Sequence, residues 1–429
     1  MKIIDIIDQF ISGEWGEEKY SDSTPYKVAC IRGADISPID NGDFTHIPTR
    51  YISKRSFEGK RLQAGDIVVE KSGGSPTQST GRVAFISQNL IDSVGSVVCS
   101  NFCVAFRVTK NWNPLYIFYY LQFIYNKGVF FNFEGKTSGL KNLQLEAAYK
   151  AIPIKDIDEV HQAQIVAILD SIHRKLTINR AINQNLEALV KQLYDYWFVQ
   201  FDFPDEKGQP YKSSGGKMVW NEKLKREIPE GWSVSKVEEI AQTYSGGTPN
   251  SSNEEYYKNG TIPWINSGEL NNPIITSTSN YITQLGLDNS SAKLYPINTI
   301  LVALYGATAG KVSLLTFSAS SNQAICGVIP SKSFLVIYLY YALSSMYERF
   351  VTLSTGSARD NISQATVKIT QVIVPTGAIL AKFDNIANGI IQDIIYNQRG
   401  NESLITQRDE LLPLLMNGQV SLNSDLSND

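Results

Sequence analysis

The chain has 429 residues, of which 43 % are hydrophobic and 19 % are charged, so it can form about three folded domains and is not disordered as a whole. Its 39 Lys and Arg residues against 42 Asp and Glu residues give a net charge of −3, which excludes a uniformly basic, histone-like protein but permits a local basic surface. Four cysteines and three histidines are too few for a disulfide framework or a convincing metal cluster, so we expect no metal site. We find neither a signal peptide nor an apolar run that could span a membrane, and we therefore expect a cytoplasmic protein without a membrane partner.

The sequence contains an internal repeat. LQAGDIVVEKSGG (62–74) matches YPINTILVALYGA (295–307), and TGRVAFI (80–86) matches AGKVSLL (309–315). Further along, YIFYYLQFIY (116–125) matches IYLYYALSSMY (337–347) in the same order. We therefore predict a duplicated unit of roughly 200 residues with a pseudo-two-fold internal repeat.

The first globular part covers residues 1–154. It is rich in Gly, Ser, Thr, Asn and β-branched residues, and it contains short apolar runs such as Asp66-Ile67-Val68-Val69. This composition predicts strands joined by turns, followed by a short aromatic helix near 116–125.

A long helix is predicted over residues 155–200, because about 43 residues from Lys155 to Phe198 contain no Gly or Pro. Its apolar positions alternate in steps of three and four, which favours a coiled coil over an ordinary core helix. The predicted stripe is Ile165, Ile168, Ile172, Lys175, Asn179, Ile182, Leu186, Leu189, Leu193 and Tyr196.

The second half repeats this plan. A connector is predicted over 201–225, a second globular part over 226–376, a second long helix over 377–418 and a tail over 419–429. The second helix carries the stripe of the first at a constant offset of 218 residues, which places Asn397 at the position of Asn179. If a pseudo-two-fold axis relates the halves, the helices run antiparallel, and we predict that Asn179 and Asn397 face each other and fix the register.

Catalytic motifs are missing from the sequence. YGATAGKV (305–312) departs from a phosphate loop, because Tyr305 and Val312 stand where Gly and Ser or Thr are needed. AsnProLeuTyr (113–116) is similar to the Asn-Pro-Pro-Tyr loop of amino-methyltransferases, but no Gly-rich cofactor turn precedes it. We therefore expect a non-enzymatic chain with no catalytic residues and no cofactor of its own.

Nucleic-acid binding fits the polar and basic loops better, although a solvated surface run is an equally simple explanation of the basic segment 45–63 alone. In that segment aromatic residues interleave with cations, and other candidates come from loops at matching places in the two halves. The predicted DNA-binding residues are Arg50, Lys54, Arg55, Lys60, Arg61, Ser75, Thr77, Arg82, Lys141, Asn142, Ser245, Thr248, Lys311, Arg359 and Asn361.

Three stretches carry a family resemblance: residues 226–270, YGATAGKVSLLTFSASSNQAICGV (305–328) and ELLPLLMNGQV (410–420). With the connector before them, they resemble the DNA specificity subunits of type I restriction–modification systems, and the resemblance covers essentially the whole chain. The first globular part departs from the family pattern, because it lacks an obvious IPEGW and GGTP and instead offers SDSTPYKVACIRGADIS (21–37), which matches IPWINSGELN (262–271).

The resemblance implies an α+β fold with two mixed α/β target-recognition domains separated by two long antiparallel coiled-coil helices. It also implies that each domain reads one half of a split, asymmetric DNA target, and that the helices dock two methyltransferase subunits. Restriction and translocase subunits are then further partners. S-adenosylmethionine, ATP and magnesium belong to the partner subunits rather than to this chain.

Other classes of protein compete with this interpretation. A helical scaffold that links two non-DNA binding modules would keep the duplication but leave the polar and basic loops unexplained. An accessory protein of a DNA methyltransferase, without restriction, would keep the DNA contacts. A self-contained methyltransferase would bind S-adenosylmethionine in isolation, against which the missing cofactor motifs argue.

Overall fold

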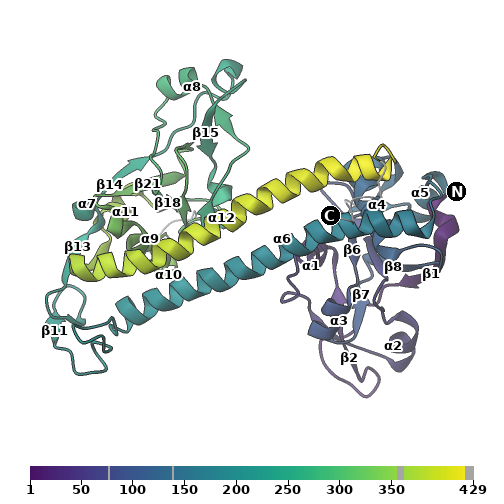
Figure 1. Cartoon of the computed structure of the whole chain (residues 1–429), viewed down its shortest axis with the longest axis horizontal. Helices are drawn as coiled ribbons and strands as arrows, with labels where there is room; N and C mark the ends of the chain where they lie inside the picture. The colour runs from purple at the N-terminus through teal and green to yellow at the C-terminus, as the bar shows by residue number, and fades with distance from the viewer. Residues whose placement is uncertain (76–77, 138–139, 355–361, 421–429) are drawn as a thin grey trace, which may run out of the picture. The chain divides into compact units, whose positions relative to one another are not determined.

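The computed structural model of the chain (Figure 1) describes residues 1–75, 78–137, 140–354 and 362–420. The chain divides into two compact units. Unit 1 comprises residues 1–180 and 401–429, and unit 2 comprises residues 181–400. Each unit therefore contains one globular part and a segment of both long helices.

Three sheets form the strand framework of unit 1. A four-stranded antiparallel sheet has the order β1-β8-β4-β6, a three-stranded sheet has the order β3-β2-β7, and another has the order β5-β10-β9. Strands β2 and β7 are parallel, whereas β2 and β3 are antiparallel. The strands are β1 Ile7–Ser12, β2 Tyr26–Ile31, β3 Thr49–Ile52, β4 Ile67–Glu70, β5 Ser72–Gly73, β6 Val83–Phe85, β7 Val97–Cys99, β8 Cys103–Val108, β9 Glu134–Thr137 and β10 Leu140–Leu143.

The helices of unit 1 include the predicted aromatic one, α4, which Asn113 caps by accepting a hydrogen bond from the Leu115 amide at 3.0 Å. Pro114 at its first position suits a helix start, because that amide has no partner there in any case. Tyr116, Ile117 and Leu121 of α4 are buried against β4 and β8 in one apolar core. The short helices are α1 Ile36–Asp40, α2 Lys54–Lys60, α3 Gln88–Val94, α4 Pro114–Asn126 and α5 Leu145–Ala151, with 3-10 turns at Ile3–Ile6, Gly33–Asp35 and Val129–Phe133.

Unit 2 is built on a five-stranded sheet of order β14-β21-β18-β19-β16 and a three-stranded sheet of order β17-β15-β20. Strands β15 and β20 are parallel, and β15 and β17 are antiparallel. Two two-stranded antiparallel sheets, β11-β12 and β13-β22, complete it. The strands are β11 Met218–Asn221, β12 Arg226–Pro229, β13 Ser233–Lys236, β14 Ala241–Ser245, β15 Ile262–Ile265, β16 Ile274–Ile275, β17 Tyr281–Ile282, β18 Ile300–Ala303, β19 Val312–Leu315, β20 Ser320–Ser321, β21 Ile325–Pro330 and β22 Gln371–Val374.

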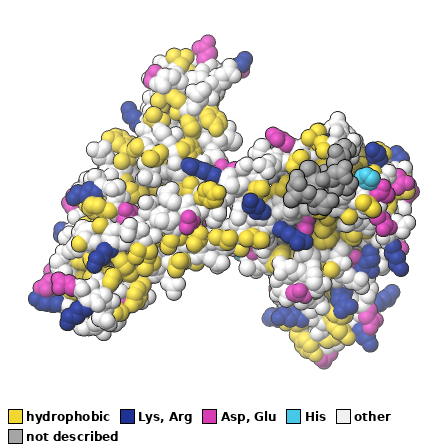
Figure 2. Space-filling model, in the orientation of Figure 1, with side chains coloured by type: hydrophobic (Ala, Val, Ile, Leu, Met, Phe, Trp, Pro, Cys, Tyr) yellow, Lys and Arg dark blue, Asp and Glu magenta, His cyan; other side chains and the backbone are white. Residues whose placement is uncertain are grey.

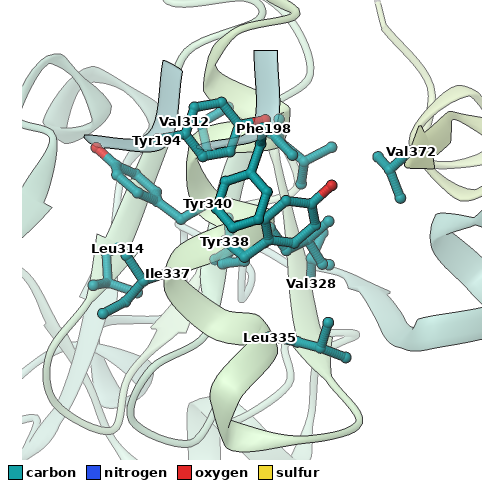
Figure 3. Close-up of a cluster of buried hydrophobic side chains, with 14 of the residues drawn as sticks. Tyr194, Phe198, Val312, Leu314, Val328, Leu335, Ile337, Tyr338, Tyr340 and Val372 are labelled. Atoms are coloured by element: carbon teal, nitrogen blue, oxygen red, sulfur yellow. The ribbon is translucent and has the colours of Figure 1, made fainter. Parts of the chain in front are cut away.

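An aromatic cluster joins the long helix to the sheet in unit 2 (Figure 3). Phe198 packs edge-on against Tyr338 at 4.7 Å between ring centroids and against Phe383 at 4.9 Å, while Tyr194 stacks on Tyr341 at 5.7 Å. These side chains bury large apolar areas, so they anchor the helix end firmly. The remaining helices are α7 Val237–Ile240, α8 Gln284–Asp288, α9 Val336–Ser344, α10 Tyr347–Ser354 and α11 Gln364–Ile369, with 3-10 turns at Glu254–Tyr256, Ser267–Asn271 and Ser333–Leu335 and a π-helical turn at Asp195–Val199.

The two units share one sheet topology. The order β1-β8-β4-β6 of unit 1 reappears as β14-β21-β18-β19 in unit 2, and β3-β2-β7 reappears as β17-β15-β20 with the same strand directions. The predicted α+β fold with an internal repeat is therefore confirmed.

The two long helices are α6 Glu159–Tyr194 and α12 Gly377–Met416 (Figure 1). They are antiparallel within each unit. In unit 1, the start of α6 around Ile165 packs on the end of α12 around Leu415, and Asn179 bonds to Asn401. Helix α6 begins at Glu159 rather than at the predicted residue 155, because Asp158 accepts the His161 amide at 2.9 Å and so caps the first turn. Within the described residues, no helix is both long and apolar enough to cross a membrane.

Half of the positions predicted for the apolar stripe of α6 are not the buried ones. Leu169, Leu176 and Val190 are at most 1 % exposed, whereas the predicted Ile182 and Leu189 are 42 % and 50 % exposed. The alternate positions of the stripe therefore lie one residue later than predicted. Adjacent apolar pairs such as Leu189 and Val190 satisfy a heptad in either phase, and only the packing partner decides which of the two is buried.

The same one-residue correction applies to α12. Ala387 and Ile394 are fully buried, whereas the predicted Ile386 is 46 % exposed. Ala387 and Ile394 lie 218 residues after Leu169 and Leu176. The offset of the repeat was thus predicted correctly, and only the phase of the stripe was wrong.

The predicted pairing of Asn179 with Asn397 is wrong. In unit 1 the Asn179 amide donates to Asn401 Oδ1 at 2.8 Å, and in unit 2 the Asn397 amide donates to Asn183 Oδ1 at 2.9 Å. Asn183 also donates to the Ile394 carbonyl at 3.1 Å. Each partner lies four residues beyond the predicted one, because the corrected stripe brings Asn183 and Asn401 inward.

Candidate nucleic-acid interface

The basic segment of unit 1 folds into β3 and helix α2, and Ser53 caps that helix by accepting the Ser56 amide at 3.2 Å. Two of its five predicted cations serve the fold. The Arg50 guanidinium lies over the Trp15 ring at 4.1 Å and is 13 % exposed, and Lys60 Nζ lies 2.6 Å from Glu14 Oε2. Because they are held by internal partners, Arg50 and Lys60 are poorly placed to contact phosphate.

The other three cations of this segment are exposed on or beside α2. Lys54 is 72 % exposed and lies 3.9 Å from Glu58, and Arg61 lies over the Phe57 ring at 5.2 Å. Arg55 is exposed and forms no ion pair in the part of the chain that the structure describes. Figure 2 shows Lys and Arg side chains on the surface around α2, at the lower right of the view. These three side chains are exposed and have at most one weak surface contact each, so they can reach a phosphate backbone at little cost.

The loop that follows β4 brings several predicted residues together, but it holds its arginine inside. Arg82 donates two hydrogen bonds to Glu70, at 2.9 and 2.6 Å, and the Glu70 side chain is 3 % exposed. Hydrogen bonding to this carboxylate raises the pKa of the Arg82 guanidinium. Arg82 thus neutralises a buried carboxylate within the fold, and its role as a DNA contact stays a prediction.

The sheet β5-β10-β9 gathers the other predicted residues of this loop. Lys141 Nζ lies 3.2 Å from Glu134 Oε2, and Ser72 donates a hydrogen bond to Asn142. The Gln78 amide donates to Ser75 Oγ at 3.1 Å. The predicted cluster therefore exists, and its charge is largely balanced within the fold. The predicted Thr77 lies outside the described residues.

In unit 2 the predicted residues are bonded to carboxamides. Ser245 Oγ donates to Gln364 Oε1 at 3.0 Å, and Thr248 donates to Gln323. Lys311 Nζ donates to Asn271 Oδ1 at 2.5 Å. The predicted Arg359 and Asn361 lie outside the described residues. The described interface candidates in this unit are consequently mainly polar, with Lys311 as their one cation, and Figure 2 shows few Lys and Arg side chains over β15 and α8.

The segment 305–312 connects β18 to the antiparallel strand β19. A phosphate loop instead runs from a strand into a helix whose N-terminus receives the phosphates. Lys311 accordingly binds Asn271 instead of lying over such a loop. The structure describes no group of three or more His, Cys, Asp or Glu side chains that could hold a metal across residues 1–75, 78–137, 140–354 and 362–420.

The four cysteines are free thiols and all are buried. Burial raises the pKa of the Cys326 thiol to about 12, so this thiol stays protonated and unreactive at neutral pH. The thiols of Cys30 and Cys103 are raised to a pKa of about 12 for the same main reason. These cysteines act as small apolar core residues.

The predicted polar turn SGGTP (245–249) packs on a second turn of unit 2, at Asn322–Gln323, which the sequence did not indicate. The Gly247 amide donates to the Ser321 carbonyl at 2.9 Å, and a Cβ on Gly246 would lie 2.1 Å from the Asn322 carbonyl oxygen. The backbone of the turn at Gly246–Thr248 thus packs directly against the backbone of the turn at Asn322–Gln323. Both Thr248 and Gln323 are exposed on top of this packed pair.

Unit 1 contains the same pair of packed turns. The Glu14 amide donates to the Cys99 carbonyl at 2.7 Å, and a Cβ on Gly13 would lie 2.0 Å from the Ser100 carbonyl oxygen. Asn101 and Phe102 are exposed on the second turn. The segment SGEW (12–15) is therefore the counterpart of SGGT (245–248), and Gly13 is the sequence signal that could have identified it.

A groove of about 1040 Å³ lies beside these turns in unit 1. Asn101 lines it together with Phe10, Ser12, Gly13 and Lys71. Phe10 is 43 % exposed, so the groove offers an apolar surface, an amide and a cation to one ligand.

Comparisons with known proteins agree on one family. The family model described as "Type I restriction modification DNA specificity domain" matches residues 39–188 and 229–396. The HindI type I restriction enzyme specificity subunit of Haemophilus influenzae is 26 % identical over 313 residues, which cover 61 % of this chain and 68 % of that protein. The MjaIX specificity subunit of Methanocaldococcus jannaschii is 24 % identical over 435 residues, covering 96 % and 94 %. Among solved structures, the S subunit of a type I restriction–modification system from M. genitalium has a TM-score of 0.55 at 14 % identity and covers 97 % of this chain and 95 % of its own, which shows a shared fold.

Proposed function

The chain belongs to the family of type I restriction–modification DNA specificity domains, and from this premise we propose that each of its two units reads one half of a bipartite, asymmetric DNA target. The observation that carries the proposal is the repeated sheet topology with different exposed side chains in the two units. A repeated scaffold holds two DNA segments in the same way, while different surface residues select different bases.

Phosphate contacts in unit 1 are proposed for Lys54, Arg55 and Arg61, whose side chains are exposed next to α2. The near-neutral charge of the chain supports weak, strongly salt-dependent binding by this subunit alone. Tight binding then requires partner subunits that add further contacts to the DNA backbone.

Two methyltransferase subunits are the proposed partners, with restriction and translocase subunits joining the complex. The duplication supports this number, because two similar surfaces on one chain accept two copies of one partner. The long helices α6 and α12 are proposed as the spacer between the half-site readers.

We assign the chain a non-catalytic role in the cytoplasm. The buried, protonated thiols and the strand-to-strand segment at 305–312 support this role. S-adenosylmethionine is therefore assigned to the methyltransferase subunits, and ATP and magnesium to the restriction subunits.

The first test is a map of DNA methylation in the host with and without this gene. One split, asymmetric methylated motif should disappear on deletion and return on complementation. If a complemented strain that expresses the methyltransferase shows no motif that depends on this gene, the proposed function is wrong.

The second test addresses the contacts of α2. In the complex with its methyltransferase subunits, the double variant Arg55→Ala/Arg61→Ala should bind the mapped motif more weakly and lower the slope of log affinity against log salt by about 2, roughly one for each lost phosphate contact. The control is Lys225→Ala, which removes an exposed lysine 2.8 Å from Glu222 in the connector hairpin. An unchanged salt slope in the double variant would move the phosphate contacts away from α2.

A further inference from the structure

We propose that Asn101 in unit 1 and Gln323 in unit 2 each read an adenine in the half-site that its own unit contacts. This inference rests on the proposed function and names the bases and side chains through which it acts. Five observations support it: equivalent backbone positions, the same functional group, available hydrogen-bonding groups, a rigid support and neighbouring cations.

The two residues occupy the same place in the repeated fold. In unit 1 the Ser100 amide donates to the Ile31 carbonyl at 2.8 Å, and in unit 2 the Asn322 amide donates to the Ile265 carbonyl at 3.0 Å. In both units this turn follows the strand that lies parallel to β2 or to β15. Asn101 and Gln323 are the next residue in each turn.

The two turns also close in the same way. The Cys103 amide donates to the Ser100 carbonyl at 2.9 Å, and the Ile325 amide donates to the Asn322 carbonyl at 3.2 Å. Between these bonds lies the second residue of each turn, and it is exposed in both units. The fold therefore presents one side chain from the same point in each unit.

Both presented side chains are carboxamides, although few other positions match between the two loops. A carboxamide donates with its NH₂ group and accepts with its oxygen, so it can bond to N7 and N6 of adenine at once. No other base offers this pair of groups side by side in the major groove. The shared group points to adenine in both half-sites.

Contacts within each unit leave these groups available. The Gln323 oxygen accepts a hydrogen bond from Thr248, which orients the amide and leaves its NH₂ donors and the second lone pair of the oxygen for a ligand. Among the described residues, the Asn101 side chain has no hydrogen-bond partner. Exposed amides with free hydrogen-bonding groups suit recognition better than support of the fold.

The support below each carboxamide is rigid. A Cβ on Gly13 or on Gly246 would lie 2.0 or 2.1 Å from a backbone oxygen of the turn that carries the carboxamide. Since the two backbones are in direct contact, each turn has little freedom to move. A side chain fixed in this way loses little entropy on binding a base.

Cations stand near both positions. Lys71 lines the same groove as Asn101. In unit 2, Lys293 is exposed and follows Ala292, whose amide lies 2.3 Å from a Cβ built on Gly247. These lysines can hold the phosphates next to the base that is read.

The experiment uses the complex of the full chain with its methyltransferase subunits and duplexes of the motif obtained by methylation mapping. Each adenine is replaced in turn by 7-deazaadenine, which lacks the N7 acceptor. The variants are Asn101→Asp and Gln323→Glu, which keep the shape of the side chain but remove the NH₂ donor. Gln323→Glu also keeps an oxygen for Thr248, so it preserves the internal bond.

For the wild-type complex, we expect one adenine in each half-site at which 7-deazaadenine weakens binding about tenfold, within the range of a lost bidentate contact. Asn101→Asp should abolish this sensitivity in one half-site only, and Gln323→Glu in the other half-site only. Each variant should also shift its position from A·T towards C·G, because a carboxylate accepts from the cytosine amino group. Asn89→Asp on α3 and Gln284→Glu on α8 are matched controls on exposed carboxamides and should change neither half-site.

Each other outcome overturns the inference. Variants that keep the wild-type sensitivity to 7-deazaadenine show that Asn101 and Gln323 do not contact adenine N7. Variants that weaken all sequences equally show that these residues contact the DNA backbone or support the fold, and thermal unfolding separates these two cases. A wild-type complex without any preferred motif overturns the proposed function itself, whereas a preferred motif with unchanged variants overturns only this inference.

Discussion

The two units differ in what surrounds the basic side chain at one matching position of the repeat. The sequence places Arg82 opposite Lys311. In unit 1, Arg82 is held by the buried carboxylate of Glu70. In unit 2, Ala303 stands at the position of Glu70 and is fully buried, and Lys311 reaches Asn271 instead. Arg82 therefore has a structural role in unit 1, because it pairs with a buried carboxylate. Lys311 has no such partner in unit 2 and makes only a surface contact.

The packed turns show the opposite relation. Their backbones make the same contacts in both units, whereas their sequences, SGEW (12–15) and SGGT (245–248), share only the first two residues. The fold is thus repeated through glycine positions and backbone hydrogen bonds. The exposed side chains are left to differ, which is what two different half-sites require.

The largest expected effect is on the buried ion pair of unit 1. Arg82→Ala should lower the free energy of unfolding by about 3 kcal/mol or more, because it leaves the carboxylate of Glu70 buried without a partner. Lys311→Ala should cost less than about 1 kcal/mol, since it removes only a contact at the surface. Denaturant unfolding followed by circular dichroism measures both variants.

The double variant Arg82→Ala/Glu70→Ala is the control for this comparison, since it removes both charges together. It should recover part of the stability that Arg82→Ala loses. Equal losses for Arg82→Ala and Lys311→Ala would contradict the assignment of different roles to the two cations.

Substitutions in the two packed turns should lower the free energy of unfolding less than Arg82→Ala does, and by similar amounts in the two units. Gly13→Ala and Gly246→Ala should each destabilise their unit by about 1–3 kcal/mol, because the new Cβ must displace a backbone carbonyl. Gly268→Ala is the matched control, since no atom lies within 4 Å of its Cβ position. If only one of the two turn variants is destabilised, the equivalence of the turns fails.

The repeat, the two long helices and the aromatic helix could be predicted from the sequence, because they depend on periodicity and on matches between the halves. The phase of the helical stripe could not. Ile168 and Leu169 are both apolar, and only the opposing helix determines that Leu169 becomes the buried residue. The asparagine pairing was predicted wrongly for the same reason. Each observed partner lies one helical turn beyond the predicted partner.

The surroundings of the candidate DNA-binding residues could not be predicted from the sequence, and their DNA contacts stay predictions. Composition located the basic residues, but Arg50, Lys60 and Arg82 were bound by Trp15, Glu14 and Glu70, which are distant in sequence or in another element. Charge in a sequence does not reveal whether a buried partner neutralises it. Asn101 could not be matched to Gln323 from the sequence, because the two turns have different sequences. Only their equivalent backbone hydrogen bonds align the two residues.

The asparagine pairs allow a finer comparison of the two units. Asn183→Ala in unit 2 should cost about 1–2 kcal/mol, because Asn183 is 6 % exposed and its loss leaves the Asn397 amide without its acceptor. Asn179→Ala in unit 1 should cost less, since Asn179 itself is half-buried and bonds to Asn401, whereas Asn183 also donates to the buried Ile394 carbonyl. Thermal unfolding measures both variants, with the exposed Asn185→Ala as control.

Cysteine pairs test the same register directly. Asn183→Cys with Asn397→Cys, and Asn179→Cys with Asn401→Cys, should each form a disulfide under mild oxidation, because the side chains at these positions meet. Asn185→Cys with Asn397→Cys is the control and should stay reduced, since Asn185 lies on the exposed face of α6. Efficient cross-linking of the control pair would contradict the observed register.

The smallest effect is expected at Glu187 in unit 2. Glu187 lies with Tyr340 and Tyr341 around a cavity of about 370 Å³, and burial raises the pKa of its carboxyl group. At the matching position of α12, 218 residues later, unit 1 has Ile405. Only unit 2 therefore carries a carboxylate that is poorly solvated at this point of the repeat.

A raised pKa means that the native state binds the proton of Glu187 more tightly than the unfolded chain does. Stability from this group is therefore complete below the ordinary glutamate pKa of about 4.3 and falls as the pH rises through the native value. Glu187→Gln should remove this slope and stabilise unit 2 at neutral pH by less than about 0.5 kcal/mol, with no gain at pH 3 to 4. Unfolding curves between pH 3 and pH 8 measure the difference, with the exposed Glu222→Gln as control. A gain that is equal at all pH values would show that packing, rather than the charge of Glu187, separates the two units here.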